Sequence, residues 1–130
     1  VKNIYNKYHN EIDQTIKNKK VKVILSLHSF NPIFKHERRT LEFGILSNED
    51  KNLSSIIINQ LKLQKLNVGD NKPYSGNLIG DSMYRHGLRN KLPHALIEVR
   101  NDLLSNPTKI KRVSRLLHKT IVKSLKKLAS

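Results

Sequence analysis

The stretch Ala95-Leu-Ile-Glu-Val99 combines four apolar residues with one carboxylate. A short apolar run of this kind is typical of a strand buried in a sheet. An unpaired carboxylate in such a strand would cost several kcal/mol, so an apolar residue would normally take its place. Glu98 is therefore either held in an ion pair, for example with Arg100, or retained for chemistry. The pattern leaves both interpretations open.

A second stretch, Val21-Lys-Val-Ile-Leu-Ser-Leu27, also predicts a strand. Its nearly continuous apolar end indicates a position inside a sheet that is covered on both faces. His28 follows directly, where the strand would leave the sheet. Ligands and catalytic groups collect at the carboxyl ends of strands in open α/β sheets. The alternative for His28 is a structural imidazole held by hydrogen bonds.

Helices and strands alternate along the rest of the chain. Apolar spacing and helix-capping residues predict helices over about 5–19, 48–66, 82–90 and 107–128, a strand over 41–46, and loops over 28–39 and 68–80. Leu63 is expected to turn inward from the second helix. This alternation indicates an α/β layered domain, with no repeat or linker to divide it.

The last predicted helix has an apolar stripe that includes Ile110, Leu117 and Leu125, with most of its lysines outside the stripe. This period predicts a helix packed on a sheet. The rival interpretation is a basic amphipathic helix that lies on an anionic membrane or along nucleic acid.

Composition narrows the classes of function. The 130 residues include 25 Lys and Arg against 10 Asp and Glu, for a net charge of +15, and no Cys. Thiolate zinc sites and cysteine nucleophiles are excluded. No apolar run approaches a membrane span and no export signal is visible, so a cytoplasmic domain that binds no membrane is expected. The lysines are spread along the chain and aromatic residues are few, which argues against specific nucleic-acid binding. A small basic module for nucleic acid or another polyanion remains the competing function.

Five fragments carry a family resemblance in their order and spacing. They are His28-Ser-Phe-Asn-Pro32, Arg39 with Phe43-Gly-Ile-Leu46, Val68-Gly-Asp-Asn-Lys-Pro-Tyr-Ser-Gly76, Arg85-His-Gly-Leu88, and Leu92-Pro-His-Ala-Leu-Ile-Glu-Val-Arg-Asn-Asp-Leu-Leu104. With Tyr8-His9 and Ile12 before them, they resemble the N-formylglutamate amidohydrolase family. That resemblance implies a three-layer α/β/α sheet domain of the zinc-carboxypeptidase-like (phosphorylase/hydrolase-like) type.

The resemblance also implies a reaction and the residues that perform it. A zinc-bound water attacks the amide of a small anionic N-acyl amino acid such as N-formyl-L-glutamate. His28 is implied as a zinc ligand and Glu98 as the base that moves the water proton. We therefore expect His28 and Glu98 on neighbouring strands, facing one cleft.

The other matched residues are assigned by the same resemblance. Arg39 and Arg100 suit a substrate carboxylate, which a guanidinium can bind through two parallel hydrogen bonds. Arg100 could equally hold Glu98 or Asp102. Asn71 and Tyr74 lie in a loop of the kind that covers a pocket. His86 is expected to contact substrate or to stabilise the oxyanion.

The chain departs from the family pattern in its metal ligands. No closely spaced ligand pair of the His-x-x-Glu type precedes His28, and one imidazole cannot hold a catalytic zinc. Residues 1–130 are therefore expected to form a single partial domain, the C-terminal part of such an enzyme, inactive alone. Its expected partners are a separate N-terminal half or a second copy, because missing strands leave an open sheet edge.

Overall fold

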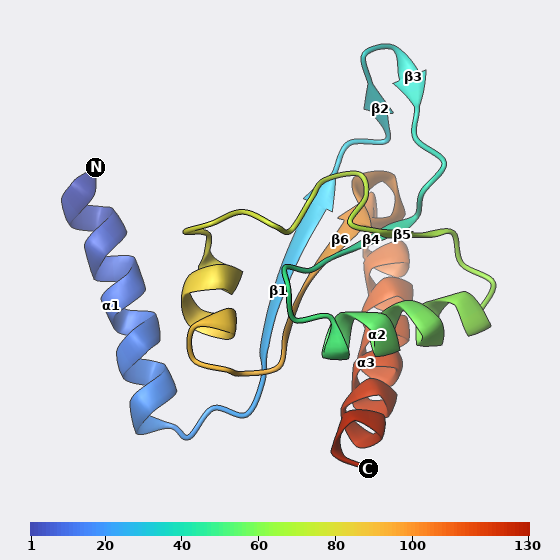
Figure 1. The fold of residues 1–130 in the computed structure, drawn as a ribbon. Helices are drawn as coiled ribbons and strands as arrows, with labels where there is room; N and C mark the ends of the chain where they lie inside the picture. The colour runs from blue at the N-terminus through green and yellow to red at the C-terminus, as the bar shows by residue number, and fades with distance from the viewer.

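The structure, a computed structural model, describes residues 1–130 and contains a four-stranded sheet with helices on both sides (Figure 1). The sheet strands are β1 (Ile24–Phe30), β4 (Phe43–Leu46), β5 (Val68–Asp70) and β6 (His94–Arg100). The helices are α1 (Lys2–Asn18), α2 (Asn52–Leu63), the π-helical segment η1 (Met83–Leu88), the 3₁₀ segment η2 (Asn101–Leu104) and α3 (Pro107–Ala129).

The strands follow the order β1-β6-β4-β5, so β6 lies inside the sheet. It runs parallel to β1 and antiparallel to β4, while β4 and β5 run parallel. The fold is therefore mixed α/β. This agrees with the predicted class, and the parallel pair gives β1 and β6 a common carboxyl end.

Alternation along β6 divides its side chains between two environments. Ala95, Ile97 and Val99 belong to the hydrophobic core, together with residues of α2 and α3. Leu96 and Glu98 point to the opposite face, because successive side chains of a strand alternate. Glu98 is thus only 5% exposed, yet it lies outside the apolar core.

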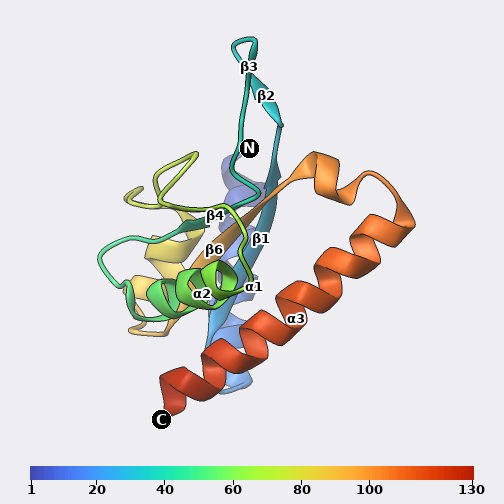
Figure 2. The same cartoon turned by 90° about the vertical axis from the view of Figure 1, so that its right-hand side faces the viewer.

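The helices form a layer on each side of the sheet. Helices α2 and α3 pack against each other and cover one face, whereas α1 and η1 lie on the other side (Figures 1 and 2). The start of α3 is fixed by Asn106, whose side chain accepts a hydrogen bond from the Lys109 amide at 2.9 Å, and by Pro107 in the first turn.

Strand β1 differs from the sequence prediction in two ways. It is an edge strand and Leu27 is 62% exposed, so the expectation of a strand covered on both faces is wrong. It also spans Ile24–Phe30 rather than Val21–Leu27, so His28 lies within the strand and not after it. An apolar run indicates a preference for the strand conformation, but it does not indicate which strands or helices cover that strand.

Two expected loops contain short strands that the sequence pattern does not predict. The expected loop over 68–80 begins with β5, and the expected loop over 28–39 contains a hairpin of β2 (Ile33–Phe34) and β3 (Glu37–Arg38). Its turn residues Lys35 and His36 both have positive φ, an unusual conformation for these residue types. Leu63 and Ile110 are exposed, contrary to the inward positions expected for them.

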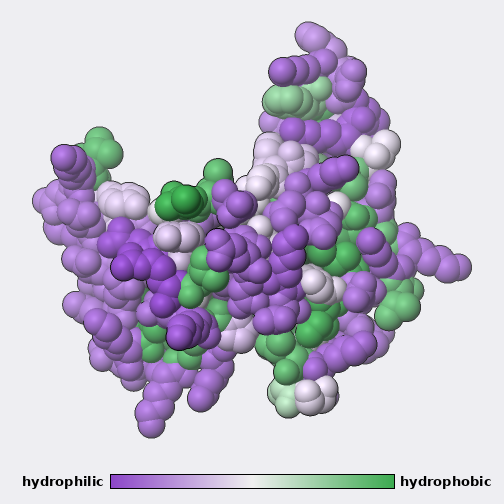
Figure 3. Space-filling model, viewed as in Figure 1, coloured by the Kyte–Doolittle hydropathy of each residue, from purple (hydrophilic) through white to green (hydrophobic).

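Hydrophilic residues cover most of the face in Figure 3, with small apolar patches between them. The lysines of α3 are exposed, outside the Val113 and Leu117 side chains that enter the core. None of the helices has the length and apolar character that a membrane span requires.

The packing of α3 gives a stability test. Leu117→Ser should lower the free energy of unfolding by about 2–5 kcal/mol, because it removes a buried leucine from the core. Ile110→Ser, on the same helix but 47% exposed, is the matched control and should change stability by less than about 1 kcal/mol. Urea denaturation measures both. Unchanged stability of Leu117→Ser with reduced polyanion affinity would instead support the detached amphipathic helix.

Candidate functional site

A cavity of about 360 Å³ opens on the sheet face opposite α2 and α3. His28 and Glu98 lie at its floor as direct register partners on β1 and β6. Ser26 of β1, Tyr8 of α1 and Tyr74 of the loop after β5 lie around them. The expectation that His28 and Glu98 occupy neighbouring strands and face one cleft is confirmed.

The two residues at the floor are close but not tightly paired. His28 Nδ1 lies 3.7 Å from Glu98 Oε1, while His28 Nε2 lies 3.2 Å from the Ser26 hydroxyl. Glu98 Oε2 is buried and has no hydrogen-bond partner. Most buried polar atoms are satisfied, so this oxygen is an exception, and Glu98 keeps unmet hydrogen-bonding capacity in the wall of the cavity.

Burial sets the electrostatics of Glu98. Desolvation raises the pKa of its carboxyl above the ordinary value of 4.5, and the nearby His28 and Arg39 charges oppose that rise. A raised pKa makes the ionised carboxylate a stronger proton acceptor. The surroundings of Glu98 therefore suit a general base.

The loop after β5 is held across the sheet by close backbone contacts. Gly44 is the register partner of Glu98, and a Cβ at Gly44 would collide with the Lys72 carbonyl. The side-chain oxygen of Asn71 accepts hydrogen bonds from the amides of Ser47 at 3.0 Å and Gly76 at 2.9 Å. Asn71 thus organises the loop that positions Tyr74 at the cavity.

Arg39 lies beside this loop. Its Nη1 donates to the Tyr74 hydroxyl at 3.1 Å and to the Asn31 carbonyl at 3.3 Å. The guanidinium also lies over the rings of Phe34 and Tyr74, with its carbon 4.7 and 5.2 Å from the ring centroids. Its Nε and Nη2 donors make no hydrogen bond within the chain, so one edge of the guanidinium is open to an anion.

Two of the predicted site residues are engaged elsewhere. His86 is 1% exposed, is hydrogen-bonded to His9 and Asp13, and does not itself line the cavity. Arg100 makes a two-pronged ion pair with Asp102 at 2.7 and 3.2 Å and donates to three backbone carbonyls. The Arg100 guanidinium in turn lowers the pKa of Asp102. The structure brings His28, Glu98, Tyr74 and Arg39 together, and it gives Arg100 the stabilising role that the sequence left open.

Sequence reasoning missed several polar residues of the cavity wall, namely Ser26, Ser75, Asp81 and Ser82. A signal existed for Ser26, since it lies two positions before His28 and therefore on the same strand face. The others come from a loop whose path the sequence pattern does not specify.

The side chains at the cavity supply too few donors for a zinc ion. A catalytic zinc takes three protein ligands. The cavity lining offers one imidazole, His28, and two carboxylates, Glu98 and Asp81, but these three side chains do not converge, and no group of three or more His, Asp or Glu side chains does so anywhere in the structure. The metal-ligating side chains of these 130 residues do not by themselves complete a zinc site.

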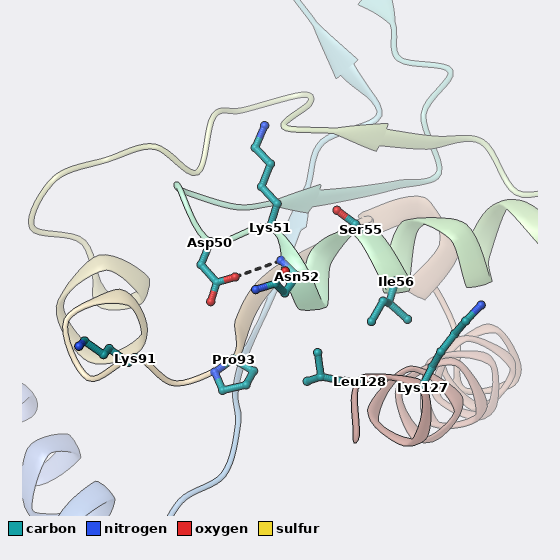
Figure 4. Close-up of a pocket in the computed structure, with 9 residues that line it drawn as sticks. All are labelled: Asp50, Lys51, Asn52, Ser55, Ile56, Lys91, Pro93, Lys127 and Leu128. Atoms are coloured by element: carbon teal, nitrogen blue, oxygen red, sulfur yellow. Dashed lines mark hydrogen bonds between the residues drawn. The ribbon is translucent and has the colours of Figure 1, made fainter. Parts of the chain in front are cut away.

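A larger hollow of about 630 Å³ lies between the start of α2 and the end of α3 (Figure 4). Lys51, Lys91 and Lys127 line it, and Asp50 there accepts a hydrogen bond from the Asn52 amide at 3.0 Å. It contains none of the predicted site residues. The smaller cavity is the better candidate, because it holds the buried, unpartnered carboxylate.

Replacing Glu98 tests its electrostatics without substrate. Because its folded-state pKa is raised, Glu98 favours the fold fully below about pH 4.5 and loses that contribution as pH rises through the raised pKa. At pH 8 the free energy of unfolding of Glu98→Gln should therefore exceed that of wild type by about 1–3 kcal/mol, which is the cost of a buried unsatisfied group. The variant should accordingly unfold at a higher urea concentration. The difference should shrink toward pH 4. Exposed Glu49→Gln is the control, and a loss of stability at pH 8 would contradict the assignment.

Comparison with known proteins identifies a family and a similar solved structure. No curated protein matches the chain. The crystal structure of gene product Atu2144 from Agrobacterium tumefaciens is similar, with a TM-score of 0.89 and 26% sequence identity. The match covers 97% of this chain and 52% of that one, so the chain spans about half the length of this structural relative. The family model of N-formylglutamate amidohydrolase matches residues 1–105, and the chain belongs to this family.

Proposed function

We propose that the chain is the part of an amidohydrolase that supplies the general base and the carboxylate-binding arginine for cleavage of N-formyl-L-glutamate or a similar N-acyl amino acid. The observation that carries the proposal is Glu98, a buried carboxylate with one unpartnered oxygen beside a cavity. His28 lies next to it and the Arg39 charge acts on it. Membership of the amidohydrolase family supports this reaction class.

Glu98 moves the protons of the reaction. Its carboxylate accepts a proton from water as the water oxygen bonds to the acyl carbon, and the protonated carboxyl then gives that proton to the nitrogen as the carbon–nitrogen bond breaks. General acid–base catalysis by one positioned group typically contributes about 10²–10⁴-fold. The raised pKa of Glu98 supports the first of these steps, because a stronger base accepts the proton more readily.

Zinc is the metal that the family resemblance implies, and when bound it would activate water and polarise the carbonyl. His28 is the one imidazole that this chain offers at the cavity. We place the remaining ligands in polypeptide outside these 130 residues, within a complete domain of the zinc-carboxypeptidase-like type. The chain alone is then a partial domain and should be inactive.

Arg39 is proposed to recognise the substrate carboxylate. Its open Nε and Nη2 donors form one edge of a planar guanidinium, which matches the two oxygens of a carboxylate. Stacking on Phe34 and Tyr74 and the bond to the Tyr74 hydroxyl hold that edge in place. The role is binding, and the proton transfers do not involve it.

The test replaces the corresponding half of an active N-formylglutamate amidohydrolase with this chain. The chimera should hydrolyse N-formyl-L-glutamate in the presence of zinc, and Glu98→Gln in it should lower kcat by about 10²–10⁴-fold, the typical value of a general base. Release of formate measures the rate.

The control variant of this test is Glu49→Gln, an exposed glutamate away from the cavity, and it should keep full activity. Zinc-dependent hydrolysis by the 130-residue chain alone would overturn the proposed division of the site. A folded, zinc-loaded chimera with no activity, or one in which Glu98→Gln is fully active, would overturn the role of Glu98.

A second prediction separates binding from chemistry. Arg39→Lys in the chimera should raise KM for N-formyl-L-glutamate about tenfold or more with a smaller change in kcat, because a lysine cannot offer two parallel donors. Neighbouring Arg38→Lys, whose exposed guanidinium lies 3.9 Å from Asp102, is the matched control. A fall in kcat with unchanged KM would contradict a binding role for Arg39.

A further inference from the structure

A buried polar cluster joins α1 to η1. His9 is the one buried residue of α1, with 3% of its surface exposed. Its Nδ1 lies 2.7 Å from Nε2 of His86, and Nδ1 of His86 lies 3.0 Å from Oδ1 of Asp13. Asp13 lies one helical turn after His9, so α1 holds the His86 ring from both of its nitrogens.

The hydrogen bonds fix where the protons are. A carboxylate only accepts, so Nδ1–H of His86 donates to Asp13. Nε2 of neutral His86 then accepts, and Nδ1–H of His9 donates to it. One added proton leaves this bond intact, since one ring can still donate to the other. Two added protons place an N–H against an N–H and break it.

Even the first added proton is opposed by the surroundings. Burial lowers the pKa of His9, the charges of Arg85 and His86 lower it further, and Asp13 alone acts in the other direction. Arg85 lies over the Tyr5 ring at 5.8 Å, and the Tyr5 and Tyr8 rings meet His9 edge-on. These aromatic side chains cannot compensate a second positive charge in the way that a carboxylate could.

Helix α1 has few other anchors. Ile4, Tyr5 and Tyr8 are all at least 47% exposed, and α1 has no extensive contact with any strand or helix of the fold. Ile12 and Ile16 only line a groove beside the start of β1. Tyr8, next to His9, is a wall of the cavity that holds His28 and Glu98. The polar cluster therefore determines where this wall stands.

We propose that the His9–His86 pair is a pH-sensitive latch that holds α1, and with it the Tyr8 wall of the cavity, against the rest of the fold. That the cavity matters for activity rests on the proposed function. The existence of the latch does not depend on that function. His9 binds a proton more weakly in the latched state than in the released state. Release therefore takes up protons and is favoured as pH falls below about 6.5, the ordinary value for histidine.

Hydrogen–deuterium exchange of the 130-residue chain at pH 8.0 and pH 5.5 tests this proposal. After correction for intrinsic exchange rates, the protection of α1 should fall several-fold, up to about tenfold, at the lower pH, because a histidine with an ordinary pKa of 6.5 contributes at most about that factor at pH 5.5. Protection of α2 and α3 should change little and serves as the internal reference. The readout needs neither substrate nor zinc, so its failure and a failure of the proposed function are distinguishable.

Two variants separate the latch from simple packing. His9→Asn keeps an N–H donor near the Nδ1 position without a titrating ring, and it should abolish most of the pH effect. Arg85→Gln removes a charge that opposes protonation of His9, and it should reduce the pH effect while leaving α1 protected at pH 8.0. His118→Asn, on the exposed face of α3, should behave like wild type. The latch would be overturned if wild type lost no α1 protection at pH 5.5. It would also be overturned if His9→Asn and Arg85→Gln lost as much α1 protection at pH 5.5 as wild type does.

Discussion

The parallel pairing of β1 with β6 is the constraint on which both the core and the cavity depend. Its register places His28 opposite Glu98, while Ile97 and Val99 point to the α2 and α3 layer. A slip of β6 by one residue would exchange the two faces, so that Glu98 would enter the apolar core. The cost of burying that carboxylate among apolar side chains therefore opposes the wrong register, and burial of Ile97 favours the correct one. The same interaction that organises the core delivers the carboxylate to the cavity.

The apolar runs predict the two strands of this central arrangement, and the family resemblance implies that His28 and Glu98 face one cleft. Glu98 is conspicuous as the one charged residue of an apolar run, and its lateral partner His28 follows the other apolar run. The edge position of β1 leaves no trace in the sequence. Leu27 favours a strand conformation whether or not a neighbour covers it, so its exposure depends on the rest of the fold. Strand β5 is only three residues long and includes Gly69, which is why turn signals outweighed strand signals there.

The predicted site residues fall into two groups, those at or beside the cavity and those that support the structure around it. Tyr74 lines the cavity from a loop and Arg39 is hydrogen-bonded to that tyrosine, whereas His86 and Arg100 maintain the structure around the cavity. A motif contains both kinds of residue at fixed spacing, so spacing alone cannot separate a group that contacts substrate from one that supports it. The distinction needs hydrogen-bond partners. Arg100 has a carboxylate and three carbonyls, while Arg39 retains unpaired donors.

The net charge of +15 has only a small effect on how the candidate site binds an anion. At physiological ionic strength, interactions between exposed charges are largely screened beyond about 8 Å. Lysines on α3 lie on the other side of the sheet from Glu98, so they add a diffuse attraction for anions without setting a binding geometry. Arg39 is the permanent cation whose charge acts on the Glu98 carboxyl. Selectivity for the proposed carboxylate substrate should accordingly depend on the oriented guanidinium of Arg39, and the remaining positive charge should be replaceable without loss of recognition.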